Sequence, residues 1–398
     1  MTTRGRSVLA LGLVVYVAAW AFGSKPLYPV AAGLILVSVC AWLWLRVVNR
    51  PFVAQRRVGP HEQVEGDDVS VRLELDYARR LVPPVATLVE RLGRLGEQRQ
   101  PFRRYGRRLR VEYTLKSVPR GRYVFAEARI ELSDPFGLQQ ATVPLPAPGA
   151  LLVFPRLVRL DRLFSESGAH ALEGRRLLLR RPTGFDLHSV REHEPGESLR
   201  MIHWRSTARR GQLMVKELED APRDEIAVLL DAAADAVAGS SFDVQVRAAG
   251  SILDAYLRRG RRAVLVVNSD RHESCHAASP ADRTRALELL AAVEPNGRGP
   301  LEALLGEEAS PASRALELVV VTARLDRRLV DRLVQRALSR RPVSLVHVSA
   351  PTFAGHDHRL EPELLRLQSG GVPVTIVRAG DDLKDRLEGA PVTASMHA

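Results

Sequence analysis

Two uncharged apolar runs near the start of the chain constrain its fold more than any other feature. The first, SVLALGLVVYVAAWAF, covers residues 7–22, and the second, LYPVAAGLILVSVCAWLWL, covers residues 27–45. A helix needs about 20 predominantly apolar residues to cross a bilayer, so the second run is long enough and the first is just within reach. Only the turn sequence GSKP separates them. We therefore predict a transmembrane helical hairpin within residues 1–50.

The basic residues around these runs predict the orientation of the hairpin. Arg4 and Arg6 precede it and Arg46 follows it, whereas the turn holds only Lys25. Positive flanks stay on the cytoplasmic side, so we expect a cell-membrane protein whose soluble domains face the cytoplasm. An alternative is a secretory signal peptide cleaved near Ala19–Ala21, since AWA fits a small-residue cleavage pattern. The bulk of the chain is cytoplasmic under both interpretations.

A change to period-two alternation marks the next domain. VSVRLELDY, at residues 69–77, places apolar side chains on one face and polar ones on the other, which is typical of a half-buried strand. LRVEYTLKSV and RYVFAEARIEL repeat the pattern on either side of the turn signal PRG. Short strands at this spacing favour a β-sandwich-like domain of immunoglobulin-like kind over residues 55–160.

Positive charge is concentrated early in the chain. Residues 1–129 carry a net charge of +12, which is the formal charge of the whole chain, so residues 130–398 are neutral overall. Eight arginines lie within residues 91–110. A nearby membrane anchor makes anionic lipid the preferred partner for this segment; a nucleic-acid patch, which we do not expect, and a solvated loop are the alternatives. The predicted lipid contacts are Arg103, Arg104, Arg107 and Arg108.

Apolar strands and amphipathic helices alternate over residues 222–398. The run EIAVLLD ends in Asp231, and later strands end at Asn268 and Thr322. This alternation predicts a doubly wound parallel α/β sheet, in which ligands bind beyond the carboxyl ends of the strands. We therefore place Asp231, Asn268 and Thr322 at the candidate crevice. No Gly-rich phosphate loop follows any strand, so the sequence does not support nucleotide binding.

Metal chemistry has little support in this domain. Asp231 and Asp235 offer carboxylates, but the residues between them are alanines, which bring no side-chain oxygen. HESCH, with His272, Cys275 and His276, and HDH, at residues 356–358, lack a second half at zinc spacing. We expect no cofactor, and at most weak Mg²⁺ binding at this degenerate pair of aspartates.

The most distinctive stretch is REHEPGESLRMIHWRSTARRG, in a connecting region over residues 161–221. We expect a strand, a Pro-Gly turn, a short helix capped by Ser198 and ended by Gly211, and a second strand. Its interleaved carboxylates and guanidiniums suit an ion-pair network at a domain joint, or a partner-binding surface. Ser198, Ser206, His193 and His203 could be nominated for catalysis, but no spacing rule links them, so we expect no enzyme activity.

This stretch resembles the signature of the domain-of-unknown-function 58 family. His193 replaces the usual Tyr and Glu197 the usual Asp. PRGRYVFAEARIELSDPFGL and LLVFPRL are also similar to the family's upstream β-region. The positions that match the signature are Arg191, Glu192, Pro195, Gly196, Arg200, Ile202, Trp204, Ala208 and Arg209.

The resemblance implies a membrane hairpin, a β-domain and a von Willebrand factor A-like domain, in a protein that acts with MoxR-type AAA+ ATPases. A complete A-domain metal site would read Asp-x-Ser-x-Ser, whereas Ala233 and Asp235 stand here where the serines belong. We expect a membrane-anchored scaffold that helps such an ATPase in protein assembly or maturation. The rivals are a metal-dependent ligand-binding A-domain and, after it, an enzyme that uses residues 191–211.

Overall fold

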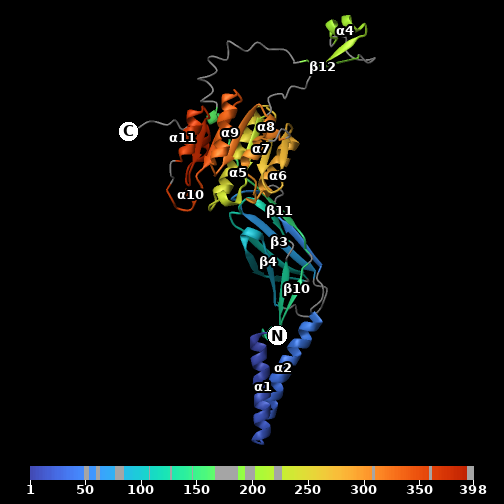
Figure 1. The fold of residues 1–398 in the computed structure, drawn as a ribbon. Helices are drawn as coiled ribbons and strands as arrows, with labels where there is room; N and C mark the ends of the chain where they lie inside the picture. Colours follow the sequence, from blue (N-terminus) through green and yellow to red (C-terminus); the bar gives the residue numbers. More distant parts are fainter. Residues whose placement is uncertain are drawn as a thin grey trace. The chain divides into compact units, whose positions relative to one another are not determined.

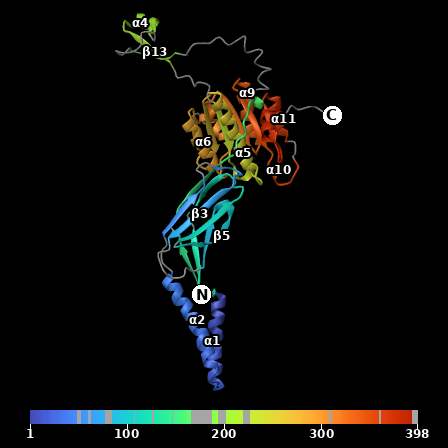
Figure 2. The same cartoon turned by 180° about the vertical axis from the view of Figure 1, so that it is seen from behind.

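The computed structural model contains two compact units, Met1–Phe154 and Pro155–Ala398 (Figures 1 and 2). It describes residues 1–48, 53–59, 63–76, 85–106, 108–125, 128–145, 147–165, 187–192, 202–218, 226–306, 310–357 and 361–391.

Two antiparallel helices begin the first unit, α1 (Thr3–Ala21) and α2 (Leu27–Val48). The rings of Tyr16 and Tyr28 meet edge to face, with centroids 5.7 Å apart. Gly12 permits the close approach of the helices, because a Cβ there would lie only 3.0 Å from Ile35 Cγ1. Both helices are long and apolar enough to cross a membrane, so the expected pair of apolar helices is confirmed.

Both free ends of this hairpin contact the β-strands of the same unit. Thr2 caps α1 by accepting a hydrogen bond from the Gly5 amide, and its own amide donates to the Leu138 carbonyl at 3.1 Å. A Cβ on Gly5 would lie 2.1 Å from that carbonyl oxygen, so only glycine lets α1 approach so closely. At the end of α2, Leu45 is buried in the core of the β-strands.

The strands of the first unit form two four-stranded antiparallel sheets and a smaller third sheet around one core. The orders are β1-β3-β7-β6, β10-β9-β4-β5 and β2-β11-β8. Alternate residues of β3 are buried, as the period-two pattern predicts. The strands are β1 (Val53–Val58), β2 (Gln63–Val64), β3 (Val69–Asp76), β4 (Val85–Arg91), β5 (Glu97–Pro101), β6 (Arg103–Tyr105), β7 (Arg108–Leu115), β8 (Gly121–Val124), β9 (Arg129–Ser133), β10 (Gln140–Pro144) and β11 (Ala150–Phe154), with a 3₁₀ turn at Gly93–Leu95.

A buried ionic network joins the two larger sheets. Arg56 of β1 donates to both carboxylate oxygens of Glu90 of β4, and Tyr113 of β7 donates to Glu90 at 2.6 Å. The guanidinium also lies 4.3 Å from the centroid of the Phe125 ring and donates to the Ala147 carbonyl. Burial, reinforced by the negative charge of Glu90, raises the pKa of Tyr113 far above its usual range.

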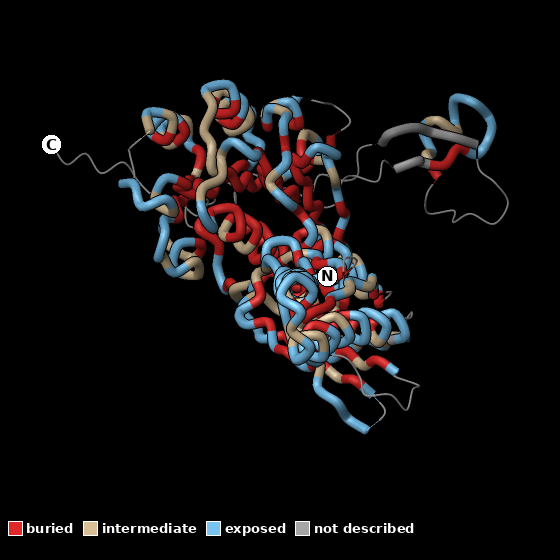
Figure 3. The backbone as a smooth tube through the Cα atoms, turned by 90° about the horizontal axis from the view of Figure 1, so that it is seen from below, coloured by how far each residue is buried: buried red, intermediate tan, exposed pale blue. Residues whose placement is uncertain are grey.

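The second unit is built on a six-stranded sheet of order β16-β15-β14-β17-β18-β19, whose central strands are buried along their length (Figure 3). All strands are parallel except β16, which pairs antiparallel with β15. Helices cover both faces, each over its own apolar core. The strands are β14 (Ile226–Asp231), β15 (Ala263–Asn268), β16 (Ser274–Ala277), β17 (Glu317–Thr322), β18 (Val343–Val348) and β19 (Val374–Val377). The helices are α5 (Ser241–Arg258), α6 (Pro280–Ala292), α7 (Leu301–Gly306), α8 (Pro311–Arg314), α9 (Arg327–Leu338), α10 (Ala350–Phe353), α11 (Pro362–Ser369) and α12 (Leu383–Glu388), with a 3₁₀ turn at Ala234–Ala236.

The last three residues of the HESCH segment, 274–276, form part of the edge strand β16. Cys275 is buried in the core, while His276 points to the exposed side of the strand. The strand alternation therefore separates the thiol from the imidazole. Of the HDH segment, His356 and Asp357 are exposed, and His358 lies outside the described residues.

A small hairpin with one helix precedes this sheet in the chain: β12 (Leu187–Glu192), β13 (Met214–Leu218) and α4 (Trp204–Arg210). The predicted start of the helix at Ser198 falls outside the described residues, and α4 has His203 as its N-cap. Ile202 precedes the helix and forms a β-bridge to Val215, so it does not belong to the helical turn. Gly211 ends the helix in the left-handed conformation, as predicted.

Candidate functional site

A buried row of polar side chains crosses the carboxyl ends of four neighbouring strands in the second unit. Asn268 is in register with Asp231, and Thr322 is in register with His347. Leu230 pairs with Val321, which brings Asp231 beside Thr322. All four residues are buried. Residues two apart in a strand point to the same face of the sheet. The residues two positions before these four all belong to one apolar core cluster, so the polar row faces the side of that cluster. The four apolar residues are Leu229, Val266, Val320 and Leu345.

The sequence predicted three members of this row and missed His347. The signal that could have found it is the polar residue near the end of VSLVHVS, at the same level as Thr322 in the next strand. His347 Nε2 lies 3.8 Å from Glu361 Oε1, at the start of α11. The row therefore extends from β15 to the helix that follows β18.

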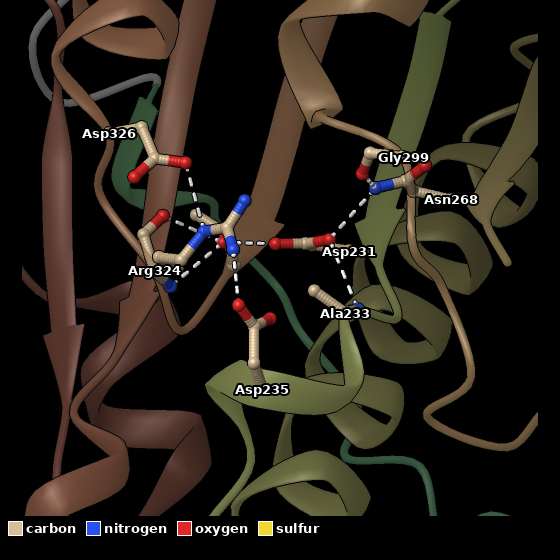
Figure 4. Close-up of polar contacts among 8 residues, drawn as sticks. Asp231, Ala233, Asp235, Asn268, Gly299, Arg324 and Asp326 are labelled. Atoms are coloured by element: carbon tan, nitrogen blue, oxygen red, sulfur yellow. Dashed lines mark hydrogen bonds and ion pairs between the residues drawn. The ribbon is translucent and has the colours of Figure 1, made fainter.

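Three groups among the described residues hold the Asp231 carboxylate: the Ala233 amide, the Asn268 side chain and the Thr322 hydroxyl. Oδ1 accepts hydrogen bonds from Asn268 Nδ2 at 3.1 Å and from the Ala233 amide at 3.2 Å, and Oδ2 lies 2.8 Å from Thr322 Oγ1 (Figure 4). Burial raises the pKa of Asp231, and the hydrogen bonds from Thr322 and Asn268 oppose that rise only in part.

The Thr322 hydroxyl has three partners but only one proton. Its oxygen lies 2.8 Å from Asp231 Oδ2 and 2.9 Å from the Arg324 carbonyl, and it accepts from the Arg324 amide at 3.0 Å. All three contacts are hydrogen bonds when Asp231 carries a proton and donates to Thr322, which in turn donates to the carbonyl. Burial acts in the same direction as this geometry, because it raises the pKa of Asp231.

Arg324, in the loop after β17, supplies a cation to this edge of the sheet. Its Nη1 lies 2.7 Å from Asp235 Oδ2 and its Nε lies 2.9 Å from Asp326 Oδ2 (Figure 4). These charge-assisted pairs fix the guanidinium above Asp231. Arg324 was not predicted as a site residue, because it lies in the loop beyond the strand and not at the strand end.

These residues do not fit a divalent cation. Mg²⁺ requires several oxygen ligands, but Ala233 has no side-chain oxygen and the Asp231 oxygens already accept protein hydrogen bonds. The guanidinium of Arg324 already contacts Asp235. Within the described part of the chain, no three His, Cys, Asp or Glu side chains are grouped as a metal site would need.

A glycine-rich loop lies over the Asp231 end of the row. The Gly297 amide donates to the Ala232 carbonyl at 2.8 Å, and Asn268 Nδ2 donates to the Gly299 carbonyl at 3.1 Å. A Cβ on Gly297 would lie 2.1 Å from the Asn268 carbonyl oxygen, so the backbone approaches too closely for any side chain. The loop backbone therefore closes this edge from above.

The family-signature residues lie in a different part of the unit. Arg191 and Glu192 are in β12, opposite Val215 and Met214 of β13. Trp204 and Arg209 are on α4, where Trp204 is 67% exposed. Pro195, Gly196 and Arg200 lie outside the described residues, so the predicted ion-pair network is described only in part.

His203 and Ser206 are brought together, but as a helix cap. His203 Nδ1 lies 2.7 Å from Ser206 Oγ and accepts a hydrogen bond from the Ser206 amide at 3.3 Å. The Ser206 amide also donates to the His203 carbonyl at 3.0 Å, so both the ring and the backbone of His203 accept hydrogen bonds at the first turn of α4. A nucleophile–base pair also needs a third group that orients the base, and no such contact of His203 is seen among the described residues.

The predicted lipid-binding arginines are on the first unit. Arg103 and Arg104 are exposed on β6, whereas Arg108, on β7, pairs with Asp76 at 2.9 Å. Arg107 lies outside the described residues. Arg110 stacks on Tyr105, with 5.0 Å between the guanidinium carbon and the ring centroid.

Together, the fold and the polar row define a chain with an apolar N-terminal hairpin, a β-unit and an α/β unit whose buried Asp231 is hydrogen-bonded to Asn268, Thr322 and the Ala233 amide. Residues 189–353 match the family model described as "Protein of unknown function DUF58", which confirms the resemblance over that range. The chain is also similar to the uncharacterized protein YeaD of Bacillus subtilis (strain 168), at 26% identity over 290 residues, 69% of this chain and 71% of YeaD.

Similarity to solved structures is weak. Cwp6 from Clostridium difficile aligns with 83% of this chain at 8% identity and a TM-score of 0.17. The chitinase ChiW from Paenibacillus sp. str. FPU-7 aligns with 81% of this chain at 8% identity and a TM-score of 0.18. The chain spans 46% of Cwp6 and 26% of ChiW, and neither likeness bears on fold or function.

Proposed function

We propose that the protein is a membrane-anchored, cytoplasm-facing interaction protein that works with a MoxR-type AAA+ ATPase in the assembly or maturation of other proteins. The observation that carries this proposal is the internal neutralisation of the carboxyl edge of the sheet by Arg324. Ligands of doubly wound folds bind at that edge, and here Arg324 pairs with Asp235 while Asp231 is hydrogen-bonded to Thr322 and Asn268. Such an edge favours a binding role over catalysis by the α/β unit.

The anchoring part of the proposal rests on the two apolar helices and their charges. Arg4 and Arg6 lie at the start of α1 and Arg46 in the last turn of α2, while Lys25 is in the turn between them. Because Thr2 and Leu45 both contact the β-unit, the start of α1 and the end of α2 lie on one side of the hairpin. The positive-inside rule makes that side the cytoplasm.

We infer, as part of this proposal, that the α/β unit is a von Willebrand factor A-like domain in which an arginine has replaced the metal ion. A parallel sheet with one antiparallel edge strand supports this assignment, as does Asp231 at the end of β14. In this proposal Arg324 takes the place of the divalent cation. The domain would then recognise a protein partner through its surface, and not through a bound metal.

The exposed face of α4 is the best-suited partner surface among the described residues. Trp204 and Arg209 belong to the residue types that most often dominate protein interfaces. Arg205 and Arg210 are also exposed on this short helix. A large exposed indole among arginines suits a partner with an apolar pocket and an acidic rim.

The test is recovery of the ATPase with the full-length protein in mild detergent. Purification in the presence of ATP or ADP, followed by mass spectrometry, should recover a AAA+ protein of the MoxR type, in amounts that depend on the nucleotide. Recovery of no AAA+ protein with either nucleotide would overturn the proposed partnership.

A further inference from the structure

The apolar hairpin identifies one end of the β-unit as the end nearest to the helices. Thr2, before α1, contacts the Leu138 carbonyl in the turn between β9 and β10. The chain leaves α2 at Val48 and enters β1 at Val53, a connection that spans at most about 17 Å. The β9–β10 turn and the start of β1 therefore mark the hairpin-proximal end.

Strand register shows which other residues share that end. Val53 pairs with Asp76, Asp76 with Arg108, and Arg108 with Tyr105, so the β6–β7 turn lies level with the start of β1. In the second sheet, Val85 pairs with Ser133, the last residue before the β9–β10 turn. The ends of both sheets thus form one surface around the base of the hairpin.

Exposed apolar side chains gather on this surface. Among the described residues between 53 and 154, the exposed large apolar ones are Val85, Tyr105, Val124 and Phe136, and three of these four lie at the hairpin-proximal end. Phe136 is 71% exposed. The buried carboxylate of Asp134 fixes its turn by accepting hydrogen bonds from the Phe136 amide at 2.9 Å and the Gln139 amide at 2.5 Å. A hydrogen-bonded turn that presents Phe136 to solvent, at the same end as Val85 and Tyr105, indicates an apolar surface that is covered by something else.

The charge of this surface is positive. Arg103 and Arg104 are exposed, and neither has a carboxylate within ion-pair distance among the described residues. Arg108, next to them, is balanced by Asp76 and Glu74. Two unbalanced guanidiniums beside an aromatic ring match the chemistry of a bilayer interface that contains anionic headgroups.

We propose that this membrane-facing surface, defined by Val85, Arg103, Arg104, Tyr105 and Phe136, rests on the bilayer. The phenyl and isopropyl groups enter the boundary between headgroups and acyl chains, and the two arginines bind the phosphates of anionic phospholipids. The inference rests on the proposed function in one respect, that the hairpin spans the bilayer. The helical hairpin brings the membrane-facing surface to the bilayer. The binding of that surface to lipid then holds the β-unit against the bilayer.

The test uses the full chain with a nitroxide label, reconstituted in phosphatidylcholine vesicles that contain about one-third phosphatidylglycerol. Cys40 is replaced by Ser, and the buried Cys275 is left in place. The label is attached at Val85→Cys, and its accessibility to oxygen and to a water-soluble nickel complex reports its depth. The matched control is Lys116→Cys, an exposed site after β7 at the opposite end of the sheet.

We expect the label at position 85 to be shielded from nickel and the label at position 116 to be open to it. Replacing Arg103 and Arg104 with Gln should lower the ratio of docked to undocked surfaces by about fivefold for each arginine. Vesicles of phosphatidylcholine alone should have the same effect without any substitution, and Phe136→Ser should also return the label toward water.

A third label, at Val14→Cys in α1, separates the two proposals. If position 14 is in lipid while position 85 is as open to nickel as position 116, the membrane-facing surface is wrong and the anchor stands. If position 14 is open to water, the anchor itself fails. Shielding at position 85 that responds neither to the arginine substitutions nor to lipid charge would overturn the binding of anionic headgroups.

Discussion

Thr322 Oγ1 lies 2.8 Å from Asp231 Oδ2, and the same oxygen also contacts both the amide and the carbonyl of Arg324. This arrangement is fully hydrogen-bonded only with a proton on Asp231. Asn is an isostere of protonated Asp, and its amide can donate to Thr322 in the same way. We therefore expect Asp231→Asn to preserve or raise the thermal unfolding midpoint of the full-length protein in detergent at neutral pH.

The matched variant is Asp231→Ala, which removes the acceptor for the Ala233 amide and for Asn268. Leaving such buried groups without partners costs about 1–3 kcal/mol each, so the midpoint should fall by several degrees. If the Asn variant were as unstable as the Ala variant, Asp231 would be ionised in the folded protein.

The raised pKa of Asp231 also predicts the sign of a pH dependence. The folded state keeps the proton on Asp231 to a higher pH than the unfolded state, whose aspartates titrate at about 3.9. Between these two values the folded state binds more protons, so the contribution of Asp231 to the unfolding free energy is full below about 3.9 and is lost as the pH rises.

Unfolding midpoints measured against pH for the wild type and for Asp231→Asn isolate this effect, because Asn does not titrate. The difference between the two should grow in favour of the Asn variant as the pH rises from about 4 toward neutrality. A difference that is constant over this range, or that grows in the opposite direction, would contradict a raised pKa.

Arg324 predicts how the protein responds to divalent cations. Mg²⁺ or Mn²⁺ should leave the unfolding midpoint of the wild type unchanged, since a guanidinium already neutralises Asp235 and Asp326. In the Arg324→Ser variant, Asp235 and Asp326 lose the guanidinium that balances their charge. The serine hydroxyl adds an oxygen that can serve as a metal ligand. We expect Mn²⁺ to stabilise this variant, by about 2.7 kcal/mol at a hundredfold excess over its dissociation constant. Stabilisation of the wild type that disappears in Asp231→Ala would instead favour a metal-dependent A-domain.

Trp204 provides a test of the partner surface. Because its side chain is largely solvent-exposed, Trp204→Ala should change the unfolding free energy by no more than about 0.5 kcal/mol. If α4 binds the ATPase, the loss of a central indole should weaken binding about 30-fold or more. Leu338→Ala, at a residue that is 73% exposed on α9, serves as the control. Equal recovery of the ATPase with both variants would place the interface elsewhere.

The buried Arg56–Glu90 pair predicts a strong coupling in the β-unit. Glu90→Leu leaves the guanidinium of Arg56 buried without its carboxylate, which costs about 3–5 kcal/mol. Arg56→Met leaves the opposite charge unpaired, with a similar cost. The double variant should be more stable than either single one, because both charges are gone. A double-mutant cycle of unfolding free energies measures the coupling, and additive effects would show that the pair is not coupled.

Hydrophobic pattern was sufficient to predict the parallel strands of the α/β unit, because each is a mainly apolar run that the sheet buries. It also placed Asp231, Asn268 and Thr322 together, since parallel strands end at one edge. It failed for β16, in which only Cys275 and Ala277 are buried, so that the short strand reads as a polar loop.

The remaining differences come from contacts between distant segments. Arg324 meets Asp235 across 89 residues, and no local pattern specifies such a pair. The start of α4 was misplaced because histidine is an uncommon cap, and Ser198 looked like the better one. The sequence predicted the arginines of the membrane-facing surface but not its apolar part, because Val85, Tyr105 and Phe136 come together only through strand register.

The two attachments of the apolar hairpin have a mechanical consequence. A unit tied to a membrane helix through one flexible connection can swivel, whereas attachment through both Thr2 and Leu45 fixes an axis. A tilt of the helices, such as a thinner bilayer imposes on a long apolar span, must then rotate the β-strands with them. If the helices span a bilayer, as we propose, the first unit moves with them, and the thickness of the bilayer is one of the forces that set its orientation.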